Sequence, residues 1–477
     1  MSFFKRSIYL ASGKTLQAIV TFVFSIVLSH LLSKFYYGTY QQVILVGHIV
    51  IPVFILGLPT AIFFFLPKFS GIKRDKFLSS ILTLFIFMSF LSVLTIYIIA
   101  INNGYIFKNN KIVTPLLLYS IFIASRILTS SIDPFLISQK REKVIFYYYS
   151  FITSLDMIFI TIFYFTKMEF VNLFIFYAIL GIVQILLTFF IINKYYKFKF
   201  MFIDIDIFKE IMTYSLPIAG NGIIGILSGN IDKLIISSFL GASIYAVYIN
   251  GSYQIPLLSL FIASIVSVIS PTITNYYHKK EHRKIVYIVR KSIEKTSIII
   301  IPLFFLLMVT SREFITALYS DKFSASVNIF RITLILLPFR VTNYGNILNL
   351  IGKSKTVFYI TLFELILNTI LSIILLNIIG IYGPAISIVC TTIIQIALLL
   401  YFISLSTKTG LLDIFPIRNI VFYISFSVIS VIPLFIVKRF ADHLTLLFIE
   451  VLLFISIFLL LYLIWRKFGR NIFGLQK

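Results

Sequence analysis

Long apolar stretches, separated by short polar connections, follow one another along almost the whole chain. Most are at least as long as the roughly 20 residues that a helix needs to cross a bilayer, and none shows the period-two alternation of a membrane β-barrel. The pattern predicts fourteen transmembrane helices, at residues 8–32, 39–66, 77–101, 112–137, 144–165, 170–192, 211–240, 242–274, 297–310, 326–351, 356–379, 382–404, 417–437 and 444–465. We therefore expect an all-α polytopic membrane protein.

Composition agrees with this expectation. Hydrophobic residues make up 60% of the chain and charged residues 12%, whereas soluble domains are about a quarter charged. The mean hydropathy is +1.03. The one cysteine, Cys390, lies inside an apolar stretch, so an intramolecular disulfide is excluded and a thiolate metal site is disfavoured.

The basic residues predict an orientation. If the apolar stretches cross the membrane in turn, 28 of the 41 Lys and Arg lie on the side of the two termini, 8 lie on the other side and 5 lie within spans. The positive-inside rule places the first side in the cytoplasm. The net charge of +24 is thus mainly a topology signal and does not indicate nucleic-acid binding. We expect a multi-pass protein of a bacterial cytoplasmic membrane with both termini inside.

The chain also contains an internal repeat. Residues 31–40 resemble residues 239–248 at an offset of 208, and residues 142–147 resemble residues 354–359 at an offset of 212. A repeat of six helices gives two halves of the same orientation, with a cavity expected between them. The predicted domains are a six-helix lobe at 1–200, a second six-helix lobe at 201–406 and two additional helices at 407–477.

Polar side chains inside the spans are candidates for lining this cavity. An ionisable residue there costs about 2.5–3.5 kcal/mol on insertion scales, so it usually faces a cavity or a partner. One helical face of the first span carries Lys14, Gln17, Thr21 and Ser25. At an offset of 208, the equivalent face of the seventh span carries Gly222, Gly225, Gly229 and Lys233. A glycine row also fits close helix packing. The candidate substrate-binding residues are Lys14, Gln17, Arg126, Asn221, Lys233, Arg340 and Asn343.

Local sequence suggests where helices bend. Pro217, followed by Gly220, Asn221 and Gly222, predicts an interrupted seventh helix and a hinge for alternating access. Pro338 predicts a kink in the tenth helix. In the fourth helix, Arg126 and Asp133 are expected on one face, with an intrahelical ion pair as the structural alternative.

Three acidic residues are candidates for ion coupling: Asp156, Asp232 and Glu364. Asp156 and Asn368 are equivalent in the repeat, and Glu364 precedes Asn368 by one helical turn. A carboxylate in a desolvated site can exchange a proton or bind Na⁺. We expect H⁺ or Na⁺ as the coupling ion, with no other cofactor, no resident metal and no catalytic residue.

Several motifs resemble the polysaccharide transporter branch of the multidrug/oligosaccharidyl-lipid/polysaccharide flippase superfamily, which includes the O-antigen flippases. They are NIDK at 230–233, FLG at 239–241, YAVY at 245–248, ILNLIGKSK at 347–355 and GIYGPA at 380–385. The resemblance implies two six-helix lobes facing a cavity. It also implies transport of undecaprenyl-diphosphate-linked oligosaccharide repeat units to the outer leaflet. The implied partners are this cargo, membrane lipids, a polysaccharide polymerase and glycosyltransferases.

Other functions remain open. A peptidoglycan lipid II flippase shares the superfamily, and so does a cation-coupled multidrug exporter, although a carrier of organic cations would be expected to have a more acidic cavity. A membrane polysaccharide polymerase or glycosyltransferase is disfavoured, because the external loops are short. The acidic pair Asp204 and Asp206 lies in a basic connector without a supporting domain, so we do not interpret it as a metal-dependent transferase site.

Overall fold

The computed structural model describes residues 3–196, 204–252, 256–437 and 443–465, and every regular element within these ranges is helical. Thirteen of the described helical segments are long and apolar enough to span a membrane. Their backbone hydrogen bonds close within each helix, which is what a lipid environment demands of a spanning segment. The expectation of an all-α polytopic membrane protein with about fourteen spans is confirmed.

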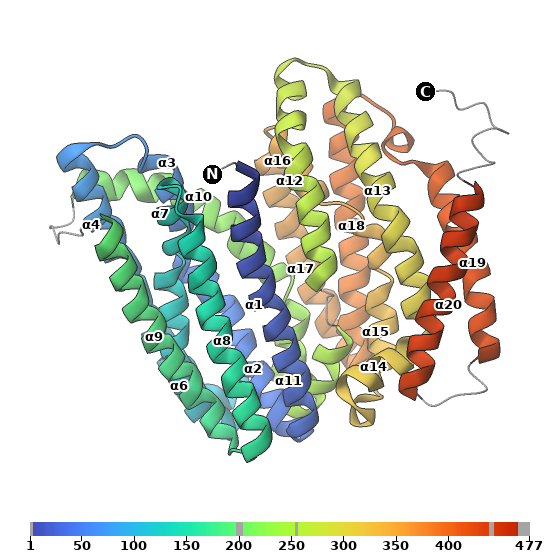
Figure 1. Cartoon of the computed structure of the whole chain (residues 1–477), viewed down its shortest axis with the longest axis horizontal. Coiled ribbons are helices and arrows are strands. Elements are labelled where there is room, and N and C mark those ends of the chain that lie inside the picture. Colours follow the sequence, from blue (N-terminus) through green and yellow to red (C-terminus); the bar gives the residue numbers. More distant parts are fainter. Residues whose placement is uncertain (1–2, 197–203, 253–255, 438–442, 466–477) are drawn as a thin grey trace. The chain divides into compact units, whose positions relative to one another are not determined.

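The chain divides into two compact units, Met1–Ala246 and Val247–Lys477. Unit 1 contains the helices up to most of α11, which Figure 1 shows in blue to green. They are α1 (Phe3–Leu31), α2 (Lys34–Ile55), α3 (Leu58–Phe65), α4 (Gly71–Ile101), α5 (Asn103–Ile106), η1 (Asn110–Ile112), α6 (Val113–Thr129), α7 (Ile132–Ser138), α8 (Glu142–Thr166), α9 (Phe170–Tyr196), α10 (Ile205–Ser228) and α11 (Ile231–Gly251).

Unit 2 contains the remaining helices, from yellow-green to red in Figure 1. They are α12 (Pro256–His278), α13 (His282–Val309), α14 (Ser311–Tyr319), η2 (Asp321–Phe323), α15 (Ser326–Leu334), η3 (Leu337–Phe339), α16 (Tyr344–Leu350), α17 (Ser354–Ile379), α18 (Tyr382–Thr407), η4 (Leu411–Ile414), α19 (Ile417–Val437) and α20 (His443–Ile464). The domain boundaries at 200/201 and 406/407, which rest on the sequence repeat, stay predictions.

Small residues allow close packing within each unit. In unit 1, α1 packs on α8, and α6 packs on α4 and α9. A Cβ atom on Gly38 of α2 would lie 1.9 Å from the carbonyl oxygen of Ala242 in α11. In unit 2, α17 and α18 form a tight hairpin, and a Cβ atom on Gly383 would lie 2.3 Å from the backbone of Leu375. Only glycine permits these approaches.

The interruption of the seventh span is not where we predicted it. Helix α10 continues through Pro217 and Gly220–Gly222, and the break falls later, at Gly229 and Asn230. A proline removes one helical hydrogen bond, a loss that membrane helices often tolerate. At the actual break, the Asn230 side-chain amide donates to the carbonyl of Ile226 at 2.8 Å, which satisfies a carbonyl at the end of α10.

The ninth span also differs from the prediction. Helix α13 begins at His282, 15 residues before the predicted start at Ser297. Its first turns carry many charged residues, which lower the mean hydropathy of any window that includes these turns. The opposite face of these turns is buried and carries Ile285, Val286, Val289 and Ile293. Apolar residues at this helical spacing favour an amphipathic helix, so the segment extends the span.

Two further spans consist of consecutive shorter helices. The tenth divides into α15, η3 and α16, with Pro338 inside η3, so the predicted kink is a full interruption. The fourth breaks at Ser130 and Ser131, between α6 and α7. Arg126 and Asp133 therefore lie on consecutive helices separated by a two-residue turn, and the prediction that they share one face stays a prediction.

Candidate functional site

The ten residues singled out from the sequence fall in both units. Unit 1 holds seven of them: Lys14, Gln17, Arg126, Asp156, Asn221, Asp232 and Lys233. Unit 2 holds Arg340, Asn343 and Glu364. Each group is described within its own unit.

Lys14 makes an ion pair. Its Nζ atom lies 2.5 Å from Oδ2 of Asp133, in the first turn of α7. The hydroxyl of Tyr149 on α8 donates to the same carboxylate at 3.3 Å. The Lys14 side chain remains 49% exposed, and Gln17, one turn further on α1, is half-buried. The positive charge of Lys14 is therefore partly neutralised by Asp133, while the Lys14 side chain stays accessible on its face of α1.

Arg126 lies among ionisable groups from three other helices of unit 1. Asp156 of α8 and His48 of α2 lie within electrostatic range of Arg126, and His48 also lies within electrostatic range of Lys233 on α11. The Arg126 guanidinium carbon is 5.9 Å from the centre of the Phe122 ring. Sequence had singled out Arg126, Asp156 and Lys233 on separate helices, and the fold brings them within electrostatic range of a common neighbourhood.

Tyrosines line the same region. Tyr119 and Tyr177 lie within electrostatic range of Asp156. These two rings contact edge to face, with centroids 5.3 Å apart, and the hydroxyls of Tyr177 and Tyr40 are 3.4 Å apart. The neighbourhood thus combines two cations, one carboxylate and buried phenol groups. Sequence reasoning missed the tyrosines, because a single aromatic in an apolar helix carries no distinctive signal.

Lys233 lies over the break in the seventh span. Its Nζ donates to the carbonyl of Gly229 at 2.9 Å and to Oδ1 of Asn230 at 3.1 Å. A cation is favoured at the carboxyl end of a helix, where the dipole is negative, so Lys233 also stabilises the end of α10. The adjacent Asp232 is only 3% exposed. Lys233 therefore has a structural partner at the end of α10, and its role in binding the cargo stays a prediction.

The glycine face of α10 is open. A Cβ atom added to Gly222 or Gly225 would meet nothing within 4 Å among the described residues. Close packing against the described residues of unit 1 therefore does not explain these two glycines. Asn221 on the same helix is exposed, and its side-chain amide donates to the carbonyl of Pro217 at 3.2 Å.

Arg340 and Asn343 lie in the interruption of the tenth span. Arg340 follows η3 and is half-buried, while Asn343 is exposed. Oδ1 of Asn343 caps α16 by accepting from the backbone nitrogen of Asn346 at 2.9 Å. The amide oxygen thus has a structural partner, as is typical of Asn at a helix start.

Glu364 belongs to a polar row between α17 and α18. The Thr391 hydroxyl donates to Glu364 Oε1 at 3.1 Å, and Oδ1 of Asn368 accepts from Ser372 and Ser387 at 3.0 and 2.8 Å. Glu364 is 2% exposed and Asn368 is fully buried. Sequence reasoning missed Ser387 and Thr391, although their spacing of four residues on an apolar helix was a readable signal.

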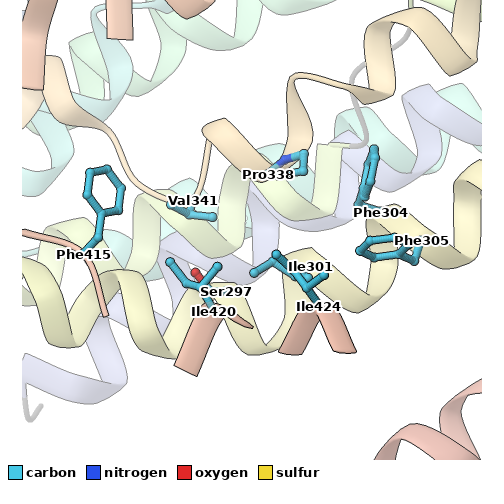
Figure 2. A pocket seen from close by; sticks show the side chains of 9 residues that line it. All are labelled: Ser297, Ile301, Phe304, Phe305, Pro338, Val341, Phe415, Ile420 and Ile424. Atoms are coloured by element: carbon cyan, nitrogen blue, oxygen red, sulfur yellow. The ribbon is translucent and has the colours of Figure 1, made fainter. Parts of the chain in front are cut away.

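A pocket in unit 2 has a different character. It lies between α13, η3 and α19, and apolar side chains such as Phe304, Pro338, Val341 and Phe415 form most of its wall (Figure 2). None of the ten predicted residues lines it. The wall suits hydrocarbon and offers no fixed charge to a polar head group.

Comparison with known proteins supports the resemblance. The family model described as polysaccharide biosynthesis protein matches residues 3–277, and the model described as lipid II flippase MurJ matches residues 144–455. A curated relative, the probable low-salt glycan biosynthesis flippase Agl15 of Haloferax volcanii, is 25% identical over 182 residues. That alignment covers 38% of this chain and 38% of the relative.

Solved structures show the same fold. The lipid II flippase MurJ, in an inward closed conformation, has a TM-score of 0.79 at 19% identity and covers 97% of this chain and 100% of its own. An inward-facing multidrug resistance MATE family transporter has a TM-score of 0.62 at 15% identity. The match covers 83% of this chain and 96% of the transporter. Since each of the two family models matches more than half of the sequence, the chain belongs to the multidrug/oligosaccharidyl-lipid/polysaccharide flippase superfamily.

Proposed function

We propose that the protein flips undecaprenyl-diphosphate-linked oligosaccharide repeat units from the cytoplasmic to the outer leaflet by alternating access. Membership of the superfamily and the match of residues 3–277 to the polysaccharide biosynthesis model support a flippase. The product would enter cell-surface polysaccharide assembly, with glycosyltransferases supplying the substrate and a polymerase using it. The protein would act in a bacterial cytoplasmic membrane with both termini inside.

The observation that carries the proposal is the pair of intramembrane cations Arg126 and Lys233 in one electrostatic neighbourhood of unit 1. A diphosphate needs fixed positive charge when it leaves water, and charge-assisted hydrogen bonds to phosphate are stronger than neutral ones. Lys14, Gln17 and Asn221 would add polar contacts for the sugars from α1 and α10. Arg340 and Asn343 would do the same from unit 2, and the isoprenoid chain would remain in lipid.

A lipid II flippase is the second candidate. The match of residues 144–455 to the lipid II flippase model and the TM-score of 0.79 favour it. Both cargoes present a polyprenyl diphosphate, so the cations fit either, and the two candidates differ in the sugars. A multidrug exporter of organic cations fits less well, because cations such as Arg126 and Lys233 would repel its cargo.

Ion coupling would use Asp156, Asp232 and Glu364. Glu364 has the most defined surroundings, since Thr391 donates to it and Asn368 lies one turn away. Carboxylate, hydroxyl and amide oxygens suit a hard cation, and a buried carboxylate can also exchange a proton. We propose H⁺ or Na⁺ as the coupling ion.

Depletion in living cells tests the cargo. Lipid-linked oligosaccharide repeat units and lipid II are quantified in each leaflet after expression is shut off. We expect repeat units to accumulate in the cytoplasmic leaflet while the distribution of lipid II is unchanged. Accumulation of lipid II instead would establish the second candidate. No accumulation of either would reject both.

A further inference from the structure

The end of the α12–α13 hairpin in unit 2 carries a concentration of positive charge. We call residues 276–287 the α12–α13 tip; Figure 1 shows its two helices side by side and joined by a short turn. Its exposed residues include two lysines on the turn and two basic residues at the start of α13. They are Lys279, Lys280, Arg283 and Lys284.

The tip is built on a buried apolar support. Ile273 of α12 and Ile285 and Val286 of α13 are buried in one core cluster of unit 2. The turn is closed by backbone hydrogen bonds from Lys280 to Tyr277 at 3.0 Å and from Glu281 to Tyr276 at 2.9 Å. The basic side chains therefore project from a backbone of fixed shape, which lowers the entropy lost when a partner binds.

Among the residues that the structure describes, one ion pair offsets part of this charge. The ion pair that the structure records within the tip joins Lys284 to Glu281 at 3.0 Å. Four basic residues against one acidic residue leave a formal charge of +3 with the histidines neutral. At the start of α4, the equivalent helix of the first repeat, Lys76 pairs instead with Asp204 of the connector at 3.0 Å. Residues 68–76 of the first repeat carry the same formal charge of +3, and one ion pair is recorded at each of the two sites.

The length of α13 places the tip beyond the lipid head groups. Twenty residues counted back from Val309, the end of α13, reach Arg290, so the helix from His282 to Val289 extends beyond the hydrocarbon. Eight residues rise about 12 Å, whereas the head groups of one leaflet add roughly 5–7 Å. Head groups can reach Arg290 at this boundary, whereas Arg283 and Lys284 lie about 9–11 Å further along the helix and so beyond them.

We infer that the α12–α13 tip docks an acidic surface of a cytoplasmic protein, through carboxylates that pair with Lys279, Lys280, Arg283 and Lys284. Charge complementarity of this kind mainly sets association rate and specificity. The inference goes beyond the proposed transport activity, because the tip is separate from the residues assigned to the cargo.

Peptide binding to the full-length protein tests the inference. The protein is placed in nanodiscs of phosphatidylcholine, and the probe is a fluorescent helical peptide, acetyl-(Glu-Ala-Ala-Glu-Ala)₃-amide, with a Gln-for-Glu peptide as control. The tip variant changes Lys279, Lys280, Arg283 and Lys284 to Gln. The matched variant changes Lys140, Arg141, Lys353 and Lys408, which have the same summed charge and the same predicted side of the membrane.

We expect the Glu peptide to bind, and the tip variant to weaken binding about tenfold or more, as loss of several charge pairs should. Binding should fall with added salt, and the matched variant should change it less than about twofold. Equal weakening in both variants would show general attraction to a basic protein and would overturn the inference, as would failure of the wild-type protein to bind.

A second measurement separates a protein partner from lipid. In a Cys390→Ser background, His278→Cys is labelled with bimane, and nanodiscs contain nitroxide lipids and about a third phosphatidylglycerol, an amount that gives a strongly negative surface. Unquenched bimane with retained peptide binding supports the inference. Quenching together with loss of peptide binding would place the tip among head groups and overturn it. In proteoliposomes the tip variant should flip cargo like wild type, and loss of flipping would assign the tip to transport instead.

Discussion

The ammonium nitrogen of Lys14 on α1 lies 2.5 Å from a carboxylate oxygen of Asp133 on α7, and Tyr149 on α8 donates a hydrogen bond to the same carboxylate. Three helices of unit 1 are thereby joined through one acidic side chain. An isolated charge in a span is costly, and pairing lowers this cost for both residues. The pair also leaves Lys14 half-exposed, so that a cargo phosphate would compete with Asp133 for the same cation.

Asp133→Asn should destabilise unit 1 and leave Lys14 without its counter-charge. We expect a loss of about 1–3 kcal/mol, between the values for exposed and buried pairs, seen as a lower thermal midpoint in detergent. The exchanged variant, Lys14→Asp with Asp133→Lys, should recover much of the stability but not transport, because the cation then lies on α7. Full transport in the exchanged variant would contradict a cargo role for Lys14.

Arg126→Gln should abolish most transport without unfolding the protein. A hydrogen bond to a charged group is worth about 1.5–3 kcal/mol, so flipping per folded molecule should fall about tenfold or more. Lipid-linked oligosaccharide accumulating in the cytoplasmic leaflet is the readout. The control is Arg331→Gln, since the Nε of Arg331 already donates to Ser311 at 2.6 Å. Equal losses in the two variants would argue against a specific role for Arg126.

Two glycines of unit 1 should respond differently to a methyl group. In Gly38→Ala the new Cβ would lie 1.9 Å from the carbonyl oxygen of Ala242, and overpacking of this kind costs about 1–3 kcal/mol or more. In Gly222→Ala the Cβ meets nothing within 4 Å, and better helix propensity adds up to about 1 kcal/mol. The thermal midpoint should therefore be lower than that of the wild type for Gly38→Ala, and equal to it or higher for Gly222→Ala.

The spans were predictable from sequence because lipid imposes one simple rule, an apolar run of sufficient length. The breaks were harder to place. Pro217 carries a strong signal and does not break α10, whereas the break at Gly229 and Asn230 depends on side chains that cap the helix end. The start of α13 was missed because charges on one face mask the apolar face opposite.

Pairings across helices were beyond sequence reasoning. Lys14 and Asp133 are 119 positions apart, and nothing in either local pattern indicates the other. Only one side of the polar row between α17 and α18 could be predicted. Glu364 and Asn368 are unusual in an apolar helix and could be recognised. Their donors, Thr391 and Ser387, are residue types that apolar helices often carry. Small hydroxyl side chains become informative only once the facing helix is known.

Glu364→Gln should keep the fold and remove ion coupling at that site. The amide oxygen can still accept from Thr391, which donates to Glu364 Oε1 at 3.1 Å, while the negative charge and the exchangeable proton are lost. In proteoliposomes, flipping by this variant should no longer respond to an imposed H⁺ or Na⁺ gradient. The control Ser372→Ala removes a hydrogen bond to Asn368 and should retain the response. An unchanged response in Glu364→Gln would move coupling to Asp156 or Asp232.

Asp204, just before α10, should make stability depend on pH. Its carboxylate accepts from Lys76 at 3.0 Å and from the backbone nitrogens of Asp206 and Ile207. The hydrogen bond from Lys76, followed by that from Ile207, holds the pKa of Asp204 below its ordinary value. A lowered pKa in the folded state stabilises the fold above the unfolded value of about 3.9, and the stabilisation is lost as the pH falls through the folded pKa.

Asp204→Asn isolates the charge, because an amide oxygen can still cap α10. Its thermal midpoint should lie below that of the wild type at pH 7, and the two should converge as the pH falls below about 4. Lys76→Gln should reproduce this profile, and the double variant should lose little more than either single one, since both changes remove the same pair. A difference between wild type and Asp204→Asn that persists unchanged at low pH would assign the effect to packing, because a protonated Asp204 has no charge left to lose.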